Sequence, residues 1–291
     1  AGGSYGGLGG GTNPTNAAYG DFTNPTEPGS GGGTAWPSGG GSGGGLVRIT
    51  AASAQIDGAI AANGGDGWFN ADTAGSGGGI LLDVGTLGGT GSITANGGKG
   101  RYGGGGGGGR VAVSYQSADQ FDLTKVTAFA ATGGAGTGAA GTVYLQDATG
   151  KGTLRIDSAG NPTAAWTPLG IPGDTAVTVD RLVVSGAGVV VAPDHGMPIN
   201  VGSLTVQNGA LLTHRVTTAA DTYSLEVNVS GALNVATGAS IDVSGRGYLV
   251  GRTTGNSTTG AATGDAGGSY GGLGGGTNPT NAAYGDFTNP T

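Results

Sequence analysis

Side chains that could act as nucleophiles or general bases are scarce in this sequence. Two histidines and no cysteine occur among the 291 residues. His195 stands in a Pro-Asp-His-Gly stretch that is typical of a turn, and His214 ends an apolar run beside Arg215. No nucleophile elbow, Walker loop or zinc-ligand spacing is present. We therefore expect no catalytic residue and no enzymatic activity.

The acidic residues leave one enzymatic alternative open. Asp119 with Asp122, and Asp174 with Asp180, are the nearest approaches to carboxylate pairs, and all four stand in loop-like sequence. Paired carboxylates are what a glycan-cleaving enzyme needs for acid and base catalysis. A polysaccharide lyase is accordingly the third of three functional hypotheses, and solvated loop carboxylates are the default interpretation.

Calcium binding is the metal chemistry that the sequence comes closest to. Residues 63–69 resemble the nonapeptide of calcium-binding β-rolls, but Phe69 stands where that motif has a ligand Asp. Residues 96–102 repeat the stretch with cationic side chains. An oxygen cage of repeated carboxylates is therefore not expected. We expect no cofactor, and an isolated calcium ion on Asp66 or Asp72 stays open.

Composition limits the class of protein. Glycine accounts for 71 of 291 residues without a period of three, charged residues for 10 %, and the net charge is −7. The acidic balance lacks the footprint of a nucleic-acid-binding protein. No apolar run is long enough to cross a bilayer as a helix. A glycine-rich β-protein with no nucleic-acid partner and no membrane span is expected.

A short pattern of an apolar residue, a spacer, a small apolar residue, a small polar residue and glycine recurs along the chain. Its copies begin at Ile60, Ile93, Phe129 and Ile241. The small polar residues could stack in successive coils and bond the backbone of a tight turn. This predicts a turn ladder at Asn63, Asn96, Thr132 and Ser244.

Short alternating strands follow these patterns. Val47 and Ile49 align with Leu82 and Val84, and the later pairs are Val111 with Val113, Val143 with Leu145, and Leu154 with Ile156. Apolar residues at every second position indicate half-buried strands, and repetition of such units indicates a solenoid. We predict an all-β fold, a right-handed parallel β-helix.

Glycine content and strand length change along the chain and divide it into four segments. We expect a glycine-rich seam in residues 1–45, glycine-rich solenoid coils in 46–160, coils with longer strands in 161–250, and a linker with a seam copy in 251–291. The glycine tracts within residues 29–45, 75–79 and 103–109 recur at equivalent places. Glycine lets backbones approach closely, so we expect ordered, polyglycine-II-like tracts rather than linkers.

The most informative feature is an identity between two distant segments. Residues 266–291 repeat residues 1–26 without a change, which gives a period of 265 residues. We predict that both copies share one conformation, that Tyr5 and Tyr270 have equivalent surroundings except where the sequence ends, and that the copies form a self-assembly seam. Its apolar residues are Tyr5, Leu8, Tyr19 and Phe22, and their counterparts Tyr270, Leu273, Tyr284 and Phe287.

Residues 77–84, 91–98 and 103–113 resemble the glycine-rich repeats of very large bacterial surface and adhesin-type proteins. The resemblance covers about residues 40–145, with an outlying copy at 241–247. It implies secretion to the bacterial surface, a β-helical stalk and a structural or adhesive task. It carries over no catalytic residue.

The first functional hypothesis is a structural repeat of an extracellular filament or fibrous surface protein, with further copies of itself as partner, joined head to tail. Separate subunits that exchange identical ends would give the same open assembly. The alternative is a module that binds cell-surface glycans or a receptor. Its contacts would be aromatic residues in polar loops, namely Tyr5, Tyr19, Phe22, Trp36, Trp68 and Phe69.

Overall fold

The computed structural model describes residues 1–34, 39–67, 73–161 and 163–290, without the side chain of Asp119. Trp36, Trp68, Phe69 and Asp72 lie outside the described residues. The chain forms two compact units. Unit 1 comprises Ala1–Thr213 with Leu225–Asp242, and unit 2 comprises His214–Ser224 with Val243–Thr291.

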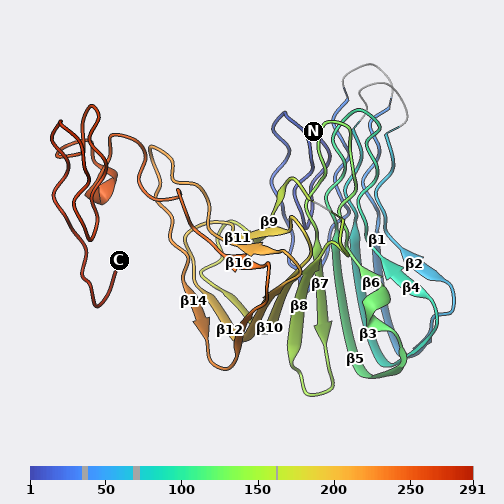
Figure 1. Ribbon diagram of the computed structural model, residues 1–291. Helices are drawn as coiled ribbons and strands as arrows, with labels where there is room; N and C mark the ends of the chain where they lie inside the picture. Colours follow the sequence, from blue (N-terminus) through green and yellow to red (C-terminus); the bar gives the residue numbers. More distant parts are fainter. Residues whose placement is uncertain (35–38, 68–72, 162, 291) are drawn as a thin grey trace. The chain divides into compact units, whose positions relative to one another are not determined.

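All the strands among the described residues belong to unit 1 and form three sheets (Figure 1). The nine-stranded sheet contains, in spatial order, β1 (Leu46–Gln55), β3 (Gly79–Gly89), β5 (Arg110–Phe121), β7 (Thr142–Gln146), β8 (Gly152–Asp157), β10 (Val177–Ser185), β12 (Ile199–Gln207) and β14 (Val227–Val229), with β15 (Leu233–Val235) also paired to β12.

Two smaller sheets form a second face in each half of unit 1. The first half has β2 (Ala59–Ala61), β4 (Ser92–Thr94) and β6 (Val126–Thr127). The second half has β9 (Trp166–Leu169), β11 (Val190–Pro193), β13 (Leu211–Leu212) and β16 (Ser240–Ile241). Helical structure is limited to the 3-10 turns η1 (Leu123–Lys125) and η2 (Thr254–Asn256) among the described residues.

Each strand pairs in parallel with its counterpart one coil further along the chain. Ile60 of β2 lies opposite Ile93 of β4, and Leu182 of β10 lies opposite Leu204 of β12. The result is a parallel β-solenoid of about six turns, which confirms the fold predicted from the sequence. One pair departs from the pattern, because β7 and β8 are antiparallel and joined by a short hairpin. Strand direction therefore reverses once, midway through unit 1.

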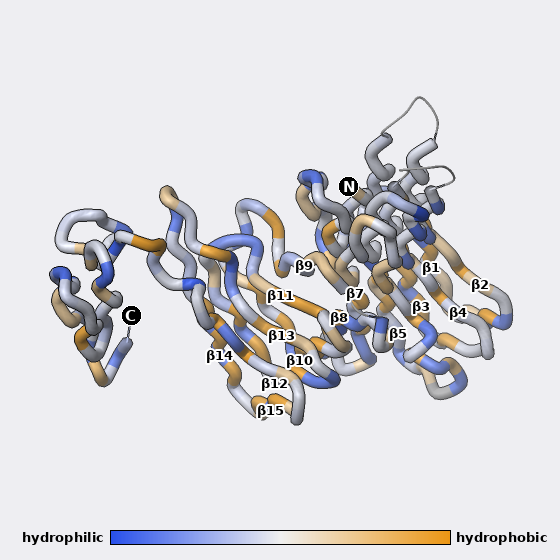
Figure 2. The backbone as a smooth tube through the Cα atoms, turned by 45° about the horizontal axis from the view of Figure 1, so that its top comes forward, coloured by the Kyte–Doolittle hydropathy of each residue, from blue (hydrophilic) through white to orange (hydrophobic). Residues whose placement is uncertain are grey.

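The alternating residues form the core. Figure 2 shows that hydrophobic positions recur along the strands. Ile80 and Leu82 of β3 are buried, whereas Asp83 between Leu82 and Val84 points outward. Val47 pairs with Ile80 and Ile49 with Leu82, so the sequence alignment of this strand was two residues out. A shift of two residues keeps every side chain on its face of the sheet.

The predicted turn ladder is present at two of its positions. The Oδ1 atom of Asn63 accepts the Asn96 amide at 2.8 Å, and Asn96 Oδ1 accepts the Phe129 amide at 2.7 Å. The step between coils is 33 residues in both cases. The prediction of Thr132 as the next member is wrong, because Val126 pairs with Ile93 and places Phe129 opposite Asn96. Ser244 belongs to unit 2.

Glycine tracts line the remaining side of the first half of unit 1. Figure 1 shows them as traces without arrows that run side by side near the N-terminus. They are hydrogen-bonded to one another through their backbones. We call them the glycine layer, which comprises residues 1–10, 29–33, 40–45, 73–78, 95–98, 103–109 and 136–141.

Residues 105–109 show how the layer is bonded. Their amides donate to three neighbouring segments in rotation: Gly105 to Gly136 (2.9 Å), Gly106 to Gly98 (2.9 Å), Gly107 to Gly3 (3.0 Å), Gly108 to Ala139 (2.9 Å) and Gly109 to Ala95 (2.7 Å). Rotation every three residues matches a polyproline-II helix, which has no internal hydrogen bonds and must find partners outside itself. The tracts are therefore ordered, as the sequence predicts.

No side chain fits in the centre of the layer. A Cβ placed on any residue from Gly104 to Gly109 would lie under 3.0 Å from a neighbouring backbone atom. Real Cβ atoms do not approach so closely. Glycine in this tract is consequently a packing requirement and not a source of flexibility.

We predict that Gly107→Ala destabilises the protein by about 1–3 kcal/mol, the usual cost of overpacking. Gly58→Ala is the matched control because a Cβ there meets nothing within 4 Å. Its effect should stay within about 0.5 kcal/mol. Denaturant unfolding measures both variants. Equal effects, or rapid hydrogen exchange of the amides of residues 105–109 in the wild type, would contradict a packed layer.

Candidate assembly interface

Over their described residues, the two copies of the 26-residue segment share the same internal hydrogen bonds. In the first copy the amide of Ser4 donates to Asn16 Oδ1 at 2.9 Å, and in the second copy Ser269 donates to Asn281 Oδ1 at 2.8 Å. Both Asn side chains also donate to the carbonyl of their serine. The segment thus carries its own fold, held by side chains that satisfy backbone groups in tight turns.

A glycine under a tyrosine ring is a second shared element. Gly20 and Gly285 both have positive φ, at 73° and 87°. A Cβ at either position would lie 2.8 Å from a ring carbon of Tyr5 or Tyr270. Only glycine combines this left-handed turn with a ring packed on its backbone. The prediction of one conformation for both copies agrees with these contacts.

The surroundings of the two copies differ. The first copy is a component of the glycine layer, where Gly3 donates to the Ala74 carbonyl at 2.9 Å and Gly7 to the Gly108 carbonyl at 2.9 Å. The Leu8 carbonyl accepts the Ala139 amide at 2.7 Å. Residues 2–7 are all buried.

The second copy makes no such contacts among the described residues. A Cβ on Gly268, Gly271 or Gly272 would meet nothing within 4 Å. Tyr270 is 44 % exposed, whereas its counterpart Tyr5 is 0 % exposed. Tyr5 and Tyr270 therefore do not have equivalent surroundings in this chain, because the glycine tracts of residues 73–141 occur once and pack on the first copy.

The remaining aromatic and apolar seam residues follow the same division. Tyr19 packs on Tyr5 with 4.7 Å between ring centroids, and Phe22 packs edge-on against Tyr144 at 5.8 Å. Leu8, Tyr19 and Phe22 are half-buried. In the second copy Tyr284 is half-buried against Tyr270, while Leu273 is 72 % and Phe287 is 98 % exposed.

Arg110 holds the first copy in place. Its Nε donates to the Tyr19 carbonyl at 2.7 Å, its Nη1 to Thr142 Oγ1 at 3.2 Å, and its guanidinium lies 5.6 Å from the Tyr5 ring centroid. Burial raises the pKa of Tyr5 to about 12 and lowers that of Arg110 to about 10. At neutral pH the pair is thus a cation against a neutral ring, an attractive arrangement.

Sequence reasoning missed Arg110. The residue ends the seven-glycine run and begins β5, and its partners in the neighbouring coils are the small residues Gly79 and Thr142. A single large cation between small residues in register is a usable signal. Its aromatic partner, however, is distant in the sequence, and nothing local indicates that the guanidinium is buried.

Both ends of the solenoid present strand edges. Within the described residues, β1 has no strand on its outer side, and neither do β14, β15 and β16. Leu46 and Ile49 of β1 are exposed, as are Leu233, Val235 and Ile241 at the other end. Unpaired edges with exposed apolar side chains are templates for pairing with another chain.

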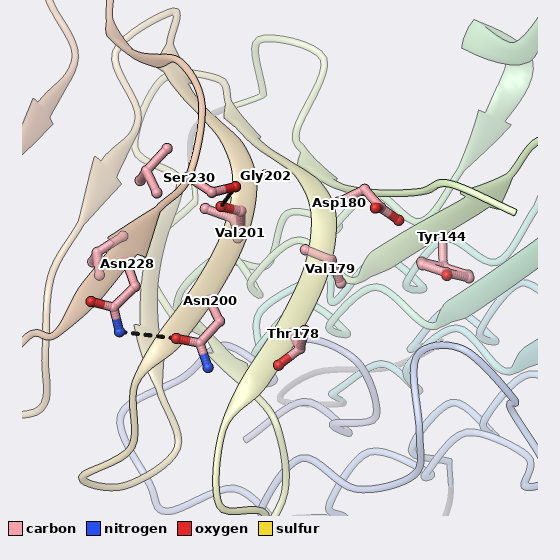
Figure 3. A pocket seen from close by; sticks show the side chains of 11 residues that line it. Tyr144, Thr178, Val179, Asp180, Asn200, Val201, Gly202, Asn228 and Ser230 are labelled. Carbon is pink, nitrogen blue, oxygen red and sulfur yellow. Dashed lines mark hydrogen bonds between the residues drawn. The ribbon is translucent and has the colours of Figure 1, made fainter. Parts of the chain in front are cut away.

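A shallow groove of about 700 Å³ crosses β7, β10, β12 and β14 in the second half of unit 1. Figure 3 shows Asn200 and Asn228 on one side of it and Tyr144 on the other. Asn228 donates to Asn200 Oδ1 at 2.9 Å. The amide groups can form hydrogen bonds with hydroxyl groups, and the aromatic ring can stack on the face of a sugar.

The residues considered for catalysis have structural partners. His195 Nε2 donates to the Asp174 carbonyl at 2.8 Å, and His214 is buried with Nδ1 donating to the Arg215 carbonyl. Asp122 accepts from Thr124, Asp174 from the Ile171 amide, and Asp180 from the Gly152 amide. The side chain of Asp119 lies outside the described part of the structure.

Of the two residues considered for calcium, the structure describes one. Asp66 Oδ1 accepts the Lys99 amide at 2.7 Å and so continues the side-chain bonding between coils. Asp72 lies outside the described residues. Across the part of the chain that the structure describes, no three His, Cys, Asp or Glu side chains come together as a metal site would require.

Comparison with known proteins gives no relative. No family model, curated protein or solved structure matches this chain. The resemblance to glycine-rich surface repeats therefore rests on the sequences of residues 77–84, 91–98 and 103–113 alone. The described part of the chain contains no helix long and apolar enough to cross a membrane.

One carboxylate fastens the second copy. Asp265 precedes it and accepts from the Thr277 amide (3.2 Å), Thr277 Oγ1 (2.7 Å) and the Asn278 amide (3.0 Å), and from the Asn278 side chain. The hydrogen bonds from the Thr277 and Asn278 side chains lower the pKa of Asp265 to about 2. The ionised carboxylate thus holds both ends of the copy's glycine hairpin.

We predict that the hydrogen bonds between Asp265 and residues 277–278, here called the Asp265 clasp, are present above the ordinary aspartate pKa. They are lost only as the pH falls through about 2, since the folded-state pKa of Asp265 is depressed. Amide chemical shifts of Thr277 and Asn278, followed during acid titration, should show this inflection. Asp265→Asn should abolish it. An inflection at the ordinary aspartate pKa would contradict the clasp.

Proposed function

We propose that this chain is a structural repeat of a long extracellular fibre, with a period of 265 residues and further copies of itself as partner. The observation that carries the proposal is the second copy of the seam. It holds the fold of the first copy, yet Gly268, Gly271 and Gly272 face open space and the side chains of Tyr270 and Phe287 are exposed. Such a segment matches a packed environment that another repeat would supply.

The strand edges support head-to-tail growth by continuous β-stacking. Both ends of the solenoid carry unpaired strands and exposed apolar side chains. Stacking related by a simple translation is open and continues without limit. Because direction reverses once at β7 and β8, repeats in the same orientation would meet in a second antiparallel pairing, between β14 or β15 and the next β1.

The low content of charged residues and the resemblance to glycine-rich surface repeats support an extracellular fibre that packs beside its neighbours. Charged residues make up 10 % of the chain, so little electrostatic repulsion opposes contact between neighbouring fibres. The resemblance to glycine-rich surface repeats favours secretion and a place on the outside of a bacterial cell. A parallel β-solenoid suits such a role, since its hydrogen bonds run along the direction of growth.

We predict that the purified protein forms filaments whose length rises with protein concentration. Leu233→Lys with Val235→Lys places two cations on an exposed edge strand and should shorten or abolish them. Val250→Lys is the control, because Val250 is fully exposed outside any strand. Negative-stain electron microscopy and sedimentation velocity give the readout. Particles of one size at every concentration would contradict β-stacking.

A glycan-binding module is the second candidate function, and the groove beside Tyr144 favours it. The aromatic residues first considered for this role are placed differently. Tyr5 is wrong as a ligand contact because it is fully buried, and Tyr19 and Phe22 are half-buried in the seam. Trp36, Trp68 and Phe69 lie outside the described residues.

If the groove binds glycans, a glycan array should give saturable binding that Tyr144→Ala weakens at least about tenfold, the effect of losing roughly 1.4 kcal/mol. Tyr102→Ala is the matched control, since Tyr102 is an exposed tyrosine that does not line the groove. Absence of saturable binding, or equal loss in both variants, would exclude this candidate.

A further inference from the structure

The geometry points to residues 266–291 as a docking segment for the glycine layer of a second copy of this chain. There they would take the place that residues 1–26 hold in their own chain. The inference rests on the proposed head-to-tail assembly and names the surface that would join successive units. It is independent of pairing between strand edges.

The segment is already folded for this role. Ser269, Thr280 and Asn281 make the same hydrogen bonds as Ser4, Thr15 and Asn16. The amide of Gly267 donates to the Gly275 carbonyl at 2.7 Å, as Gly2 donates to Gly10 at 2.7 Å. Docking a preformed segment costs little ordering entropy, because its backbone is fixed before it binds.

The glycines of the second copy fit a layer that is absent around them. Gly6 and Gly7 must be glycine, since a Cβ would strike the backbone of Gly109 or Ala139. Their counterparts Gly271 and Gly272 would tolerate a Cβ, with nothing within 4 Å. Glycine costs more backbone entropy on folding than any other residue. Docking in a glycine layer gives these positions a physical reason.

The layer would also cover the exposed side chains of the segment. In the place of the first copy, Tyr270 would lie on the Arg110 guanidinium and Phe287 against Tyr144, as Tyr5 and Phe22 do. The Tyr284 carbonyl would accept from Arg110 Nε in place of the Tyr19 carbonyl. Burial of Leu273, Tyr270 and Phe287 removes apolar surface from water, which favours association.

Competition between the two copies decides when docking occurs. They are identical in sequence, so either copy would form the same hydrogen bonds and ring packing with the layer. The first copy of the receiving chain is tethered to its own layer, so it has a higher effective concentration than the second copy of another chain and occupies the layer first. Docking between chains therefore requires that the tethered first copy be weakened or released.

The test weakens one copy at a time in the full chain. Gly6→Ala with Gly7→Ala should expel the first copy, because both Cβ atoms would strike backbone. The intact second copy should then dock in another chain, giving head-to-tail oligomers that grow with concentration. Gly271→Ala with Gly272→Ala is the matched control, which faces open space and should leave the wild-type state unchanged.

The fourfold variant, with both pairs substituted, should not oligomerise through the layer. All variants carry Leu233→Lys and Val235→Lys, so that edge stacking does not contribute. Sedimentation velocity gives the sizes, and hydrogen exchange of residues 105–109 reports whether the layer is folded and covered. A synthetic peptide of residues 1–26 should bind the first-copy variant with one peptide per chain and dissolve its oligomers.

A first-copy variant that stays monomeric and binds no peptide would overturn docking, as would a fourfold variant that oligomerises equally. If the first-copy variant does not fold, peptide binding to the wild type at high concentration, with exchange of residues 1–10, decides the matter. Loss of docking while the wild type still forms filaments would leave the proposed fibre standing on β-stacking alone. Loss of filaments with docking intact would overturn the proposed fibre instead.

Discussion

Close packing of backbone against backbone in the glycine layer is the constraint on which the first half of unit 1 depends. The solenoid coils there have only two sheet faces, and the layer closes the third side. Its hydrogen bonds take the place of an apolar interface, since glycine has no side chain to bury. Each carbonyl and amide must therefore find a partner in a neighbouring tract, and any Cβ in the centre prevents this.

The second half of unit 1 solves the same problem with side chains. Its buried residues, among them Leu182, Val184 and Leu204, fill the space between two sheets without glycine tracts. The two halves meet at the antiparallel pair β7 and β8, so backbone packing and apolar packing share one continuous sheet. Low charge is compatible with both, because neither mode of packing needs ion pairs.

Much of this arrangement could be predicted from periodicity. The repeat of apolar residues at every second position and of glycine tracts at equivalent places gives the solenoid and the ordered layer. Register was less accessible, because Val126 and Phe129 are both apolar and either could have paired with Ile93. Thr132 was misplaced for this reason. The reversal at β8 and the burial of Arg110 depend on contacts between distant segments, which no local pattern records.

The rotation of hydrogen bonds in the glycine layer also governs how such a protein can change length. Residues 105 and 108 bond one neighbour, and residues 106 and 109 another, so facing repeats every three residues. Insertion or deletion of three glycines would leave every later amide directed at the same partner. A change of one or two would turn the whole tract by a third of a revolution and leave its amides facing the wrong segments. The layer therefore accepts glycine tracts whose lengths differ by multiples of three residues and disfavours other changes in length.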